Sequence, residues 1–120
     1  MRHTFENLRV WHCSRRLSAR IHALAEQGNF GHGFALREQV CRAAISVMSN
    51  IAEGCERGST KEFLYFLRIA RGSAAEVRCQ LYAAEDIGTL DPVLARELRN
   101  EALAISRQLT SLANFRFKSG

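Results

Sequence analysis

Residues 39–54 decide the fold of this chain: Gln39-Val40-Cys41-Arg42-Ala43-Ala44-Ile45-Ser46-Val47-Met48-Ser49-Asn50-Ile51-Ala52-Glu53-Gly54. At about 100° per residue, the apolar side chains of this region cover roughly 200° of a helix, about twice the stripe expected of a helix packed on one side. One set comprises Leu36, Val40, Ala43, Ala44, Val47 and Ile51. A second set continues the arc with Cys41, Ile45, Met48 and Ala52. A helix of this kind needs two partners, so we expect the second set to be covered from outside the domain.

The composition favours one helical domain over residues 1–120. The chain is 47% hydrophobic, contains a single proline and shows no break in composition. No segment reaches the roughly 18 apolar residues needed to span a bilayer, and no signal-peptide pattern is present, so we expect a cytoplasmic protein with no membrane partner. The cysteines are irregularly spaced and are predicted to be reduced thiols: Cys13, Cys41, Cys55 and Cys79.

Turn and capping signals divide the chain into four helices, expected at residues 6–27, 34–54, 59–87 and 91–114, with a tail at 115–120. Ser59-Thr60-Lys61-Glu62 has the spacing of a capping box, and Gly88 suits a left-handed residue after a helix. Asp91-Pro92 places a cap residue before a proline at the first helical position. Four amphipathic helices joined by short turns predict an all-α, antiparallel up-down-up-down four-helix bundle. The second apolar set predicts a homo-oligomer, for which closed symmetry is the usual form.

The sequence carries no catalytic constellation. No His-x-x-x-His or Cys-x-x-Cys pair exists, and the adjacent His12 and Cys13 point to different helix faces, which argues against a metal site. Cys41 and Cys79 have no histidine at a helical neighbour spacing. The glycine-rich run at 28–33 lacks the Lys-Ser/Thr of a phosphate-binding loop. We therefore expect a non-enzymatic protein without metal or cofactor.

The charge points to anionic partners. The formal net charge is +5, and all 17 basic residues except Lys61 and Lys118 are arginines, whose planar forks of donors match phosphate. A genome that favours arginine is the alternative explanation. The candidates for binding RNA or DNA lie on three of the predicted helices and are Arg9, Arg16, Arg20, Arg68, Arg71, Arg78, Arg96, Arg99 and Arg107.

Each arginine stripe, taken alone, is typical of a solvated helix face. This holds especially where Glu62, Glu97 or Glu101 lies close enough for pairing within its own helix. Repetition around the axis of an oligomer would change that assessment, because a ring of arginines binds phosphate backbones without reading bases.

A polar ridge runs along the helix of the decisive stretch and consists of Arg42, Ser46, Asn50, Glu53 and Arg57. The favoured interpretation is structural: these groups satisfy one another together with Ser73 and Glu76 of the next helix. A buried polar group without a partner would cost roughly 1–3 kcal/mol. The alternative is a small ligand site at the turn after Glu53-Gly54.

Three runs carry a family resemblance: Phe5…Leu8-Arg9-Val10-Trp11; Arg42-Ala43-Ala44-Ile45-Ser46…Asn50-Ile51-Ala52-Glu53-Gly54; and Ser59…Lys61-Glu62-Phe63…Phe66-Leu67…Ile69-Ala70-Arg71-Gly72-Ser73…Glu76. In these runs the chain resembles the bacterial four-helix-bundle family of 23S rRNA intervening-sequence proteins, the S23 family, over nearly its whole length. Members are encoded within insertions in 23S rRNA genes or elsewhere in genomes. The matching motif residues include Arg42, Ser46, Asn50, Glu53, Gly54, Ser73 and Glu76.

The resemblance implies an assembly and a class of partner. A related group serves as the accessory protein of diversity-generating retroelements, where a basic pentameric barrel of four-helix bundles binds nucleic acid and the reverse transcriptase. The resemblance implies a closed, ring-like homo-pentamer, and the family has no established enzymatic activity to carry over. The first expected function is electrostatic binding of RNA or DNA. The alternative is a scaffold or accessory subunit for an acidic or nucleic-acid-processing protein.

Overall fold

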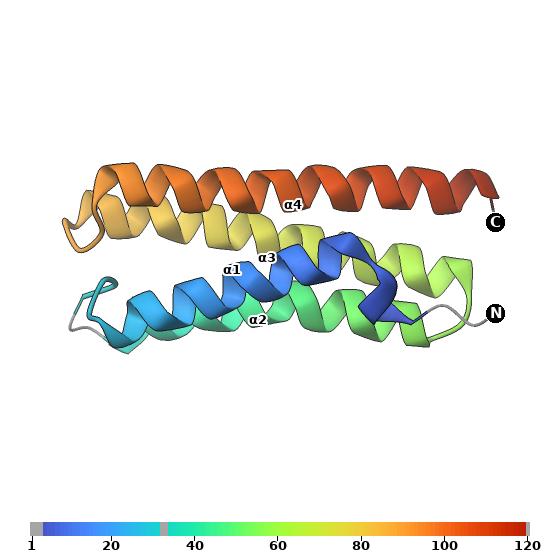
Figure 1. The fold of residues 1–120 in the computed structure, drawn as a ribbon, viewed down its shortest axis with the longest axis horizontal. Helices are drawn as coiled ribbons and strands as arrows, with labels where there is room; N and C mark the ends of the chain where they lie inside the picture. The colour runs from blue at the N-terminus through green and yellow to red at the C-terminus, as the bar shows by residue number, and fades with distance from the viewer. Residues whose placement is uncertain (1–3, 32–33, 120) are drawn as a thin grey trace.

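The computed structural model describes residues 4–31 and 34–119, which form four long α-helices and one short 3-10 helix, with no β-strand among them. The elements are η1 (Phe5–Asn7), α1 (Arg9–Glu26), α2 (Phe34–Glu56), α3 (Thr60–Asp86) and α4 (Pro92–Ser119). The long helices lie side by side in a body of 46 × 19 × 19 Å (Figure 1). The loops after α1 and α3 lie at one end of the body and the loop after α2 at the other. The all-α class and the four-helix bundle are therefore confirmed.

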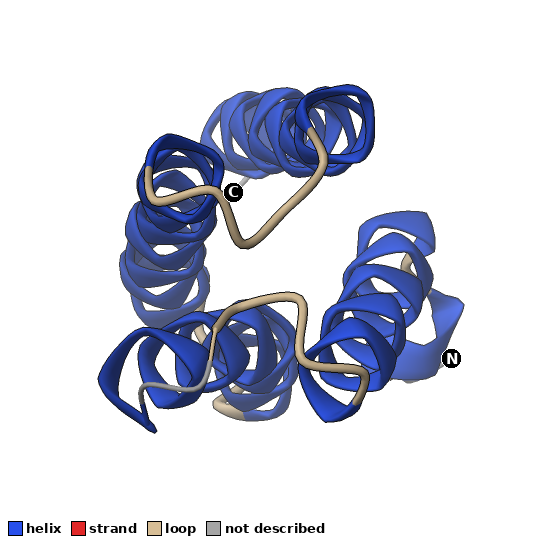
Figure 2. Ribbon diagram, turned by 90° about the vertical axis from the view of Figure 1, so that its left-hand side faces the viewer, coloured by secondary structure: helices blue, strands red, loops and turns tan. Residues whose placement is uncertain are grey.

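The four long helices are arranged around a common centre, as the end view shows (Figure 2). Their buried apolar side chains form one core between them. The first apolar set of α2 is buried apart from Leu36, which is half-buried. The other long helices contribute Val10, Leu17, Ile21, Phe63, Leu67, Val77, Leu81, Leu98, Ile105 and Leu109, among others. Burying one such large apolar side chain contributes roughly 1.5–3 kcal/mol. Among neighbouring long helices, α2 and α3 pack most extensively, and α1 and α4 least.

The predicted helix starts at Ser59 and Asp91 are confirmed by their hydrogen bonds. The Ser59 hydroxyl accepts from the Glu62 backbone N–H at 3.1 Å, and an Asp91 carboxylate oxygen accepts from the N–H groups of Val93 and Leu94, each at 3.1 Å. One detail differs from a standard capping box. The Glu62 carboxylate accepts from the Ser59 hydroxyl at 2.9 Å, and no hydrogen bond joins it to the Ser59 backbone N–H.

The predicted stop at Gly88 is also confirmed. Gly88 has a φ of +79°, and the following Thr89 N–H donates to the Ala84 carbonyl at 3.0 Å. These two features define a Schellman motif, in which orphan carbonyls at the helix end gain donors. The loop after α1 opens in the same way at Gly28, where φ is +84°.

The first long helix begins later than predicted. It was expected from residue 6, but η1 occupies residues 5–7 and α1 begins at Arg9, after Leu8 in an extended conformation. The turn folds the Phe5 ring to within 4.8 Å of the Trp11 ring, measured between centroids. This aromatic contact lies between residues six apart, and a helical periodicity does not encode it.

The last helix ends later than predicted. Residues 115–120 were expected to form a tail, but α4 continues to Ser119, the last described residue. The Arg116 guanidinium lies 4.9 Å from the centroid of the Phe63 ring on α3, which anchors the added turn. Phe115 and Phe117 remain exposed on this extension. Likewise, α2 runs to Glu56, two residues beyond its predicted end at Gly54.

The second apolar set of α2 is incompletely covered within one chain. Ile45 is 46% exposed, and Cys41, Met48 and Ala52 are half-buried. Cover for this set from another molecule stays a prediction. None of the described helices has an apolar stretch long enough to cross a membrane.

Candidate nucleic-acid interface

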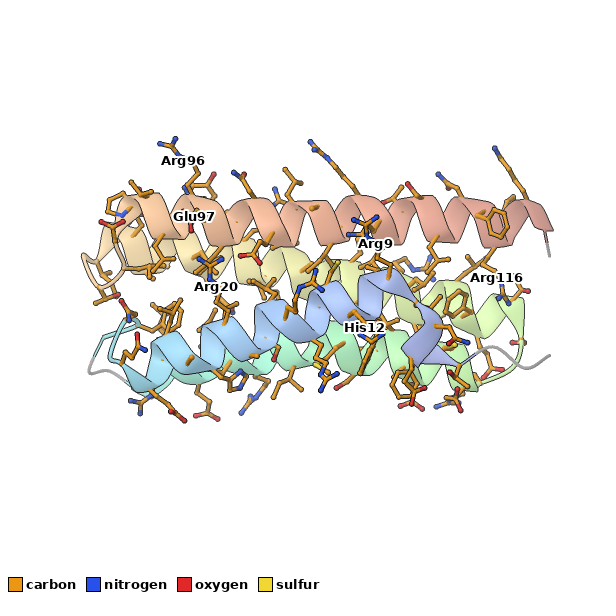
Figure 3. The ribbon with its side chains drawn as sticks, viewed as in Figure 1. Arg9, His12, Arg20, Arg96, Glu97 and Arg116 are labelled. Carbon is orange, nitrogen blue, oxygen red and sulfur yellow. The ribbon has the colours of Figure 1, made fainter. Side chains whose placement is uncertain are left out.

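The nine candidate arginines differ in what they contact. Arg20 of α1 donates to Glu97 of α4 at 2.9 Å (Figure 3). Arg20 also pairs with Glu101, which lies on α4 as well. The hydrogen bond to Glu97, with the nearby charge of Glu101, raises the pKa of Arg20. The sequence placed Arg20 on a solvated stripe and paired both glutamates within their own helix. Arg20 is exposed as expected, but the pairing within α4 was wrong, because both carboxylates reach across to α1 and balance the charge of Arg20.

Arg99 is also occupied by its own chain. It donates to Glu85 at 2.7 Å, and its guanidinium lies 3.9 Å from the centroid of the Tyr82 ring. Its side chain is only 14% exposed. Because the charge is paired and largely covered, Arg99 joins α3 to α4 and offers little to a phosphate.

Three further candidates have weaker contacts within the bundle. Arg71 donates to the Thr110 hydroxyl at 3.1 Å, Arg68 lies 6.0 Å from the Tyr65 ring, and Arg16 donates to the Cys13 sulfur at 3.4 Å. Arg68 and Arg71 share a hollow of about 160 Å³ between α3 and α4. Since none of the three meets a carboxylate in the described residues, their charges stay available.

The remaining candidates make no ion pair with any described residue and are Arg9, Arg78, Arg96 and Arg107. Arg96 points away from the bundle on α4 (Figure 3). Arg78 is half-buried on α3. Arg9 and Arg107 are brought together although they are far apart in the sequence, since both line one groove between α1 and α4.

This α1–α4 groove has a volume of about 350 Å³ and is lined by Leu8, Arg9, Val10, Arg107, Gln108, Ser111 and Leu112. The sequence identified its two arginines as candidates but missed Gln108 and Ser111. The available signal was the four-residue spacing of Arg107 and Ser111, which places them on one face of α4. The spacing alone could not predict a groove, because the other wall of the groove is formed by α1.

The polar ridge of α2 forms a hydrogen-bonded cluster with α3. The hydroxyls of Ser46 and Ser73 are 2.9 Å apart, and the Asn50 amide donates to the Ser46 hydroxyl at 2.9 Å and to its carbonyl at 2.8 Å. Ser73 is buried, so this contact supplies its polar partner. Glu76 was expected to join the cluster, but it is exposed and has no hydrogen bond or ion pair with a described residue.

The rest of the ridge is held by charge pairs along its own helix. Arg42 pairs with Glu38, and Arg57 donates to Glu53 at 3.1 Å. Arg57 also lies 3.5 Å from a Glu62 oxygen on α3, so it ties the end of one helix to the start of the next. The carboxylate of Glu53 is therefore already engaged.

The turn after Gly54 has a small hollow of its own. Its volume is about 200 Å³ and its lining includes Gly54, Cys55, Glu56, Gly58, Ser59, Phe63 and Arg116. This is the place at which the sequence suggested a small ligand site. Burial, reinforced by the charge of Glu56, raises the pKa of the Cys55 thiol. The thiol is therefore favoured over the thiolate in this hollow.

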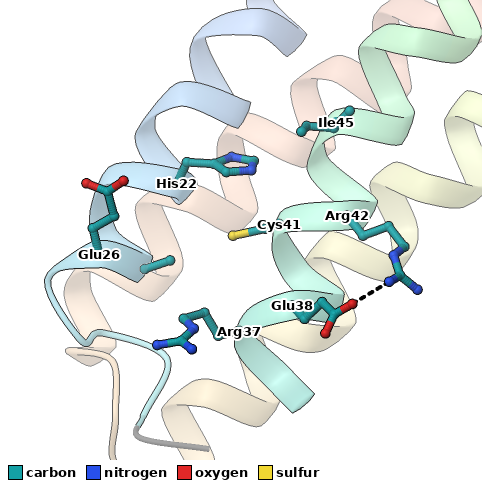
Figure 4. A pocket seen from close by; sticks show the side chains of 8 residues that line it. His22, Glu26, Arg37, Glu38, Cys41, Arg42 and Ile45 are labelled. Carbon is teal, nitrogen blue, oxygen red and sulfur yellow. Dashed lines mark hydrogen bonds and ion pairs between the residues drawn. The ribbon is translucent and has the colours of Figure 1, made fainter. Parts of the chain in front are cut away.

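A larger groove lies between α1 and α2, beside the uncovered apolar set (Figure 4). This α1–α2 groove has a volume of about 460 Å³ and is lined by His22, Ala25, Glu26, Arg37, Glu38, Cys41, Arg42 and Ile45. Burial raises the pKa of the Cys41 thiol. His22 lines the same groove, a proximity that no helical spacing revealed. Within the described residues, no group of three potential ligands is placed to hold a metal ion.

Comparison with known proteins places this fold in a family. The model of the 23S rRNA-intervening sequence protein family matches residues 6–111. A crystal structure of a protein of unknown function from the S23 ribosomal protein family of Bacteroides thetaiotaomicron has the same fold, with a TM-score of 0.79 at 21% identity, covering 87% of this chain and 97% of the other. No curated protein matches. The match over most of the chain shows that it belongs to the 23S rRNA-intervening sequence protein family.

Proposed function

We propose that this chain, as an antiparallel bundle assembled into a ring-like homo-oligomer, binds RNA or DNA through its arginines without catalysing a reaction. The observation that carries the proposal is the α1–α4 groove, where Arg9 and Arg107 face one space and neither has a carboxylate partner among the described residues. The formal charge of +5 adds a long-range attraction for a polyanion. A pentamer would carry about +25, which multiplies the phosphate contacts available on one surface.

The assembly is supported by the apolar surface left on α2. Ile45 is exposed beside the α1–α2 groove, and a second copy of the chain is the simplest cover for it. Closed symmetry is the usual form of a homo-oligomer, and five copies are what the family resemblance implies. In a cytoplasmic setting the four free cysteines would stay reduced.

A second candidate function uses the same uncovered surface for a different partner. In a scaffold or accessory subunit, the α1–α2 groove would receive a nucleic-acid-processing protein, and the arginines would receive its acidic surface. The observation that favours it is the combination of apolar Ile45 with charged neighbours on both sides of the groove.

Fluorescence anisotropy tests the first function. Labelled single-stranded RNA and duplex DNA are titrated with the protein at about 50 and 200 mM salt, and the mass in solution is measured in the same buffers. Phosphate binding predicts an oligomer whose affinity falls roughly tenfold or more at the higher salt, because counterions are released on binding. An oligomer that binds neither polymer would contradict the proposal and favour the scaffold.

A further inference from the structure

The contacts between α1 and α4, called here the α1–α4 seam, change from one end of the two helices to the other. Near the end that holds the loops after α1 and α3, Arg20 joins the two helices through Glu97 and Glu101. Farther along, the Gln108 amide reaches the Cys13 sulfur at 3.7 Å. Beyond that contact the helices leave the α1–α4 groove open. The groove therefore lies between two helices whose side chains contact each other at Arg20 and at Gln108.

Its lining has two chemical characters. Leu8, Val10 and Leu112 supply apolar surface, and Arg9 and Arg107 supply positive charge. No acidic residue lines the groove. The two glutamates on the same seam are held by Arg20, so neither competes for the groove arginines. The site thus suits a ligand that joins an anion to an apolar group.

Gln108 and Ser111 complete the lining with neutral hydrogen-bonding groups. An amide offers both a donor and an acceptor, and a hydroxyl does the same. Such groups suit the edge of a nucleobase, whereas a simple inorganic anion needs only the arginines. The volume of about 350 Å³ lies at the small end of the range for ligand sites, about 300–1,000 Å³, and matches one inserted group better than a helix of nucleic acid.

We propose that the α1–α4 groove takes one unstacked nucleotide of a single-stranded RNA or DNA, with its phosphate at Arg9 and Arg107 and its base against Leu8 and Leu112. The inference rests on the proposed nucleic-acid binding and adds a preference for single strands. In a duplex the bases are stacked and paired, and presenting one to a groove requires breaking that stacking and pairing. A single strand offers its bases at much lower cost.

The test compares three labelled probes of equal length: a single strand, its duplex, and a single strand with abasic sites. The wild-type protein is expected to bind the single strand about tenfold more tightly than either other probe, because the abasic strand lacks the base that contacts Leu8 and Leu112 and the duplex holds its bases stacked and paired. Equal binding of all three probes would overturn the inference that the groove takes a nucleotide, and it would leave the proposed nucleic-acid binding standing. Absence of binding to any probe would contradict both.

A pair of matched variants locates the effect. Ser111→Trp fills the groove and leaves every arginine in place, whereas Asn100→Trp adds the same side chain at an exposed position of α4 outside the groove lining. We expect Ser111→Trp to reduce the preference for the single strand to below about twofold, and Asn100→Trp to keep it. Thermal unfolding and solution mass establish that both variants fold and assemble. A folded Ser111→Trp protein with the full preference would overturn the inference.

Discussion

A Cβ atom placed on Gly54 would lie 2.6 Å from the Cβ of Phe66, closer than any ordinary contact. Gly54 is buried inside α2, and Phe66 belongs to α3. The absence of a side chain at this position therefore sets how closely the ends of the two helices approach.

Gly54→Ala is expected to lower the free energy of unfolding by about 1–3 kcal/mol, because the two helices must separate or shift to admit the methyl group. Gly72→Ala is the matched control, since a Cβ there meets nothing within 4 Å and the position is helical and exposed. It should raise the stability by roughly 0.5–1 kcal/mol through helix propensity. Urea unfolding measures both. A Gly54→Ala protein as stable as Gly72→Ala would show that α2 and α3 are free to separate.

The contact between Ser46 and Ser73 should be energetically coupled. Removing either hydroxyl leaves the other without this partner, at a cost of about 1–3 kcal/mol for the buried Ser73. Removing both should cost less than the sum of the single changes. A double-mutant cycle by urea unfolding measures the coupling, with the exposed Ser49→Ala as control. If the two single changes add exactly in the double variant, the 2.9 Å contact contributes no coupling free energy.

The exposed Ile45 supplies a test of assembly that is independent of nucleic acid. Ile45→Asp should shift the solution mass toward the monomer, because a charge on the uncovered apolar set opposes its burial between copies. Gln39→Asp places the same charge at an exposed position on the polar side of α2, away from Ile45, and should leave the mass unchanged. Light scattering after size exclusion gives the result. If Ile45→Asp keeps the same oligomeric mass, the interface between copies lies on another face of the bundle.

Thiol alkylation should follow burial and pKa. Cys79 is exposed, whereas burial raises the pKa of Cys41 and Cys55 and keeps more of each as the unreactive thiol near neutral pH. We expect iodoacetamide at pH 7 to modify Cys79 first. The lag of Cys41 and Cys55 should shorten as the pH rises toward their raised pKa values. Peptide mass spectrometry follows each site, and equal rates at pH 7 would contradict the expected order.

The parts of the fold that local chemistry encodes were predictable from the sequence. Ser59, Gly88 and Asp91 specify helix ends through hydrogen bonds or backbone angles within a few residues, and those ends were placed to within a residue. The two large errors in helix length have a tertiary origin. Phe5 packs on Trp11 and shortens α1, and Arg116 packs on Phe63 and extends α4.

The same distinction explains the candidate interface. Composition and helical spacing identified arginines on the helix surfaces, but they gave no information about which carboxylates lie opposite on another helix. Arg20 and Arg99 were therefore included although their charges are paired, and Gln108 and Ser111 were missed. Only the juxtaposition of α1 with α4 separates Arg9 and Arg107 from the rest.

The limited packing of α1 against α4 has a consequence for how the molecule opens. Proteins unfold locally in cooperative units, and the unit with the fewest packed contacts opens at the lowest free energy. Here α2, α3 and α4 form the tighter unit, and α1 is the shortest of the long helices. Detachment of α1 would break the Arg20 pairs and dismantle the groove while most of the remaining bundle stays folded. A ligand that bridges Arg9 and Arg107 would then hold α1 against α4. Its binding should slow amide exchange in α1, which otherwise opens at the lowest free energy.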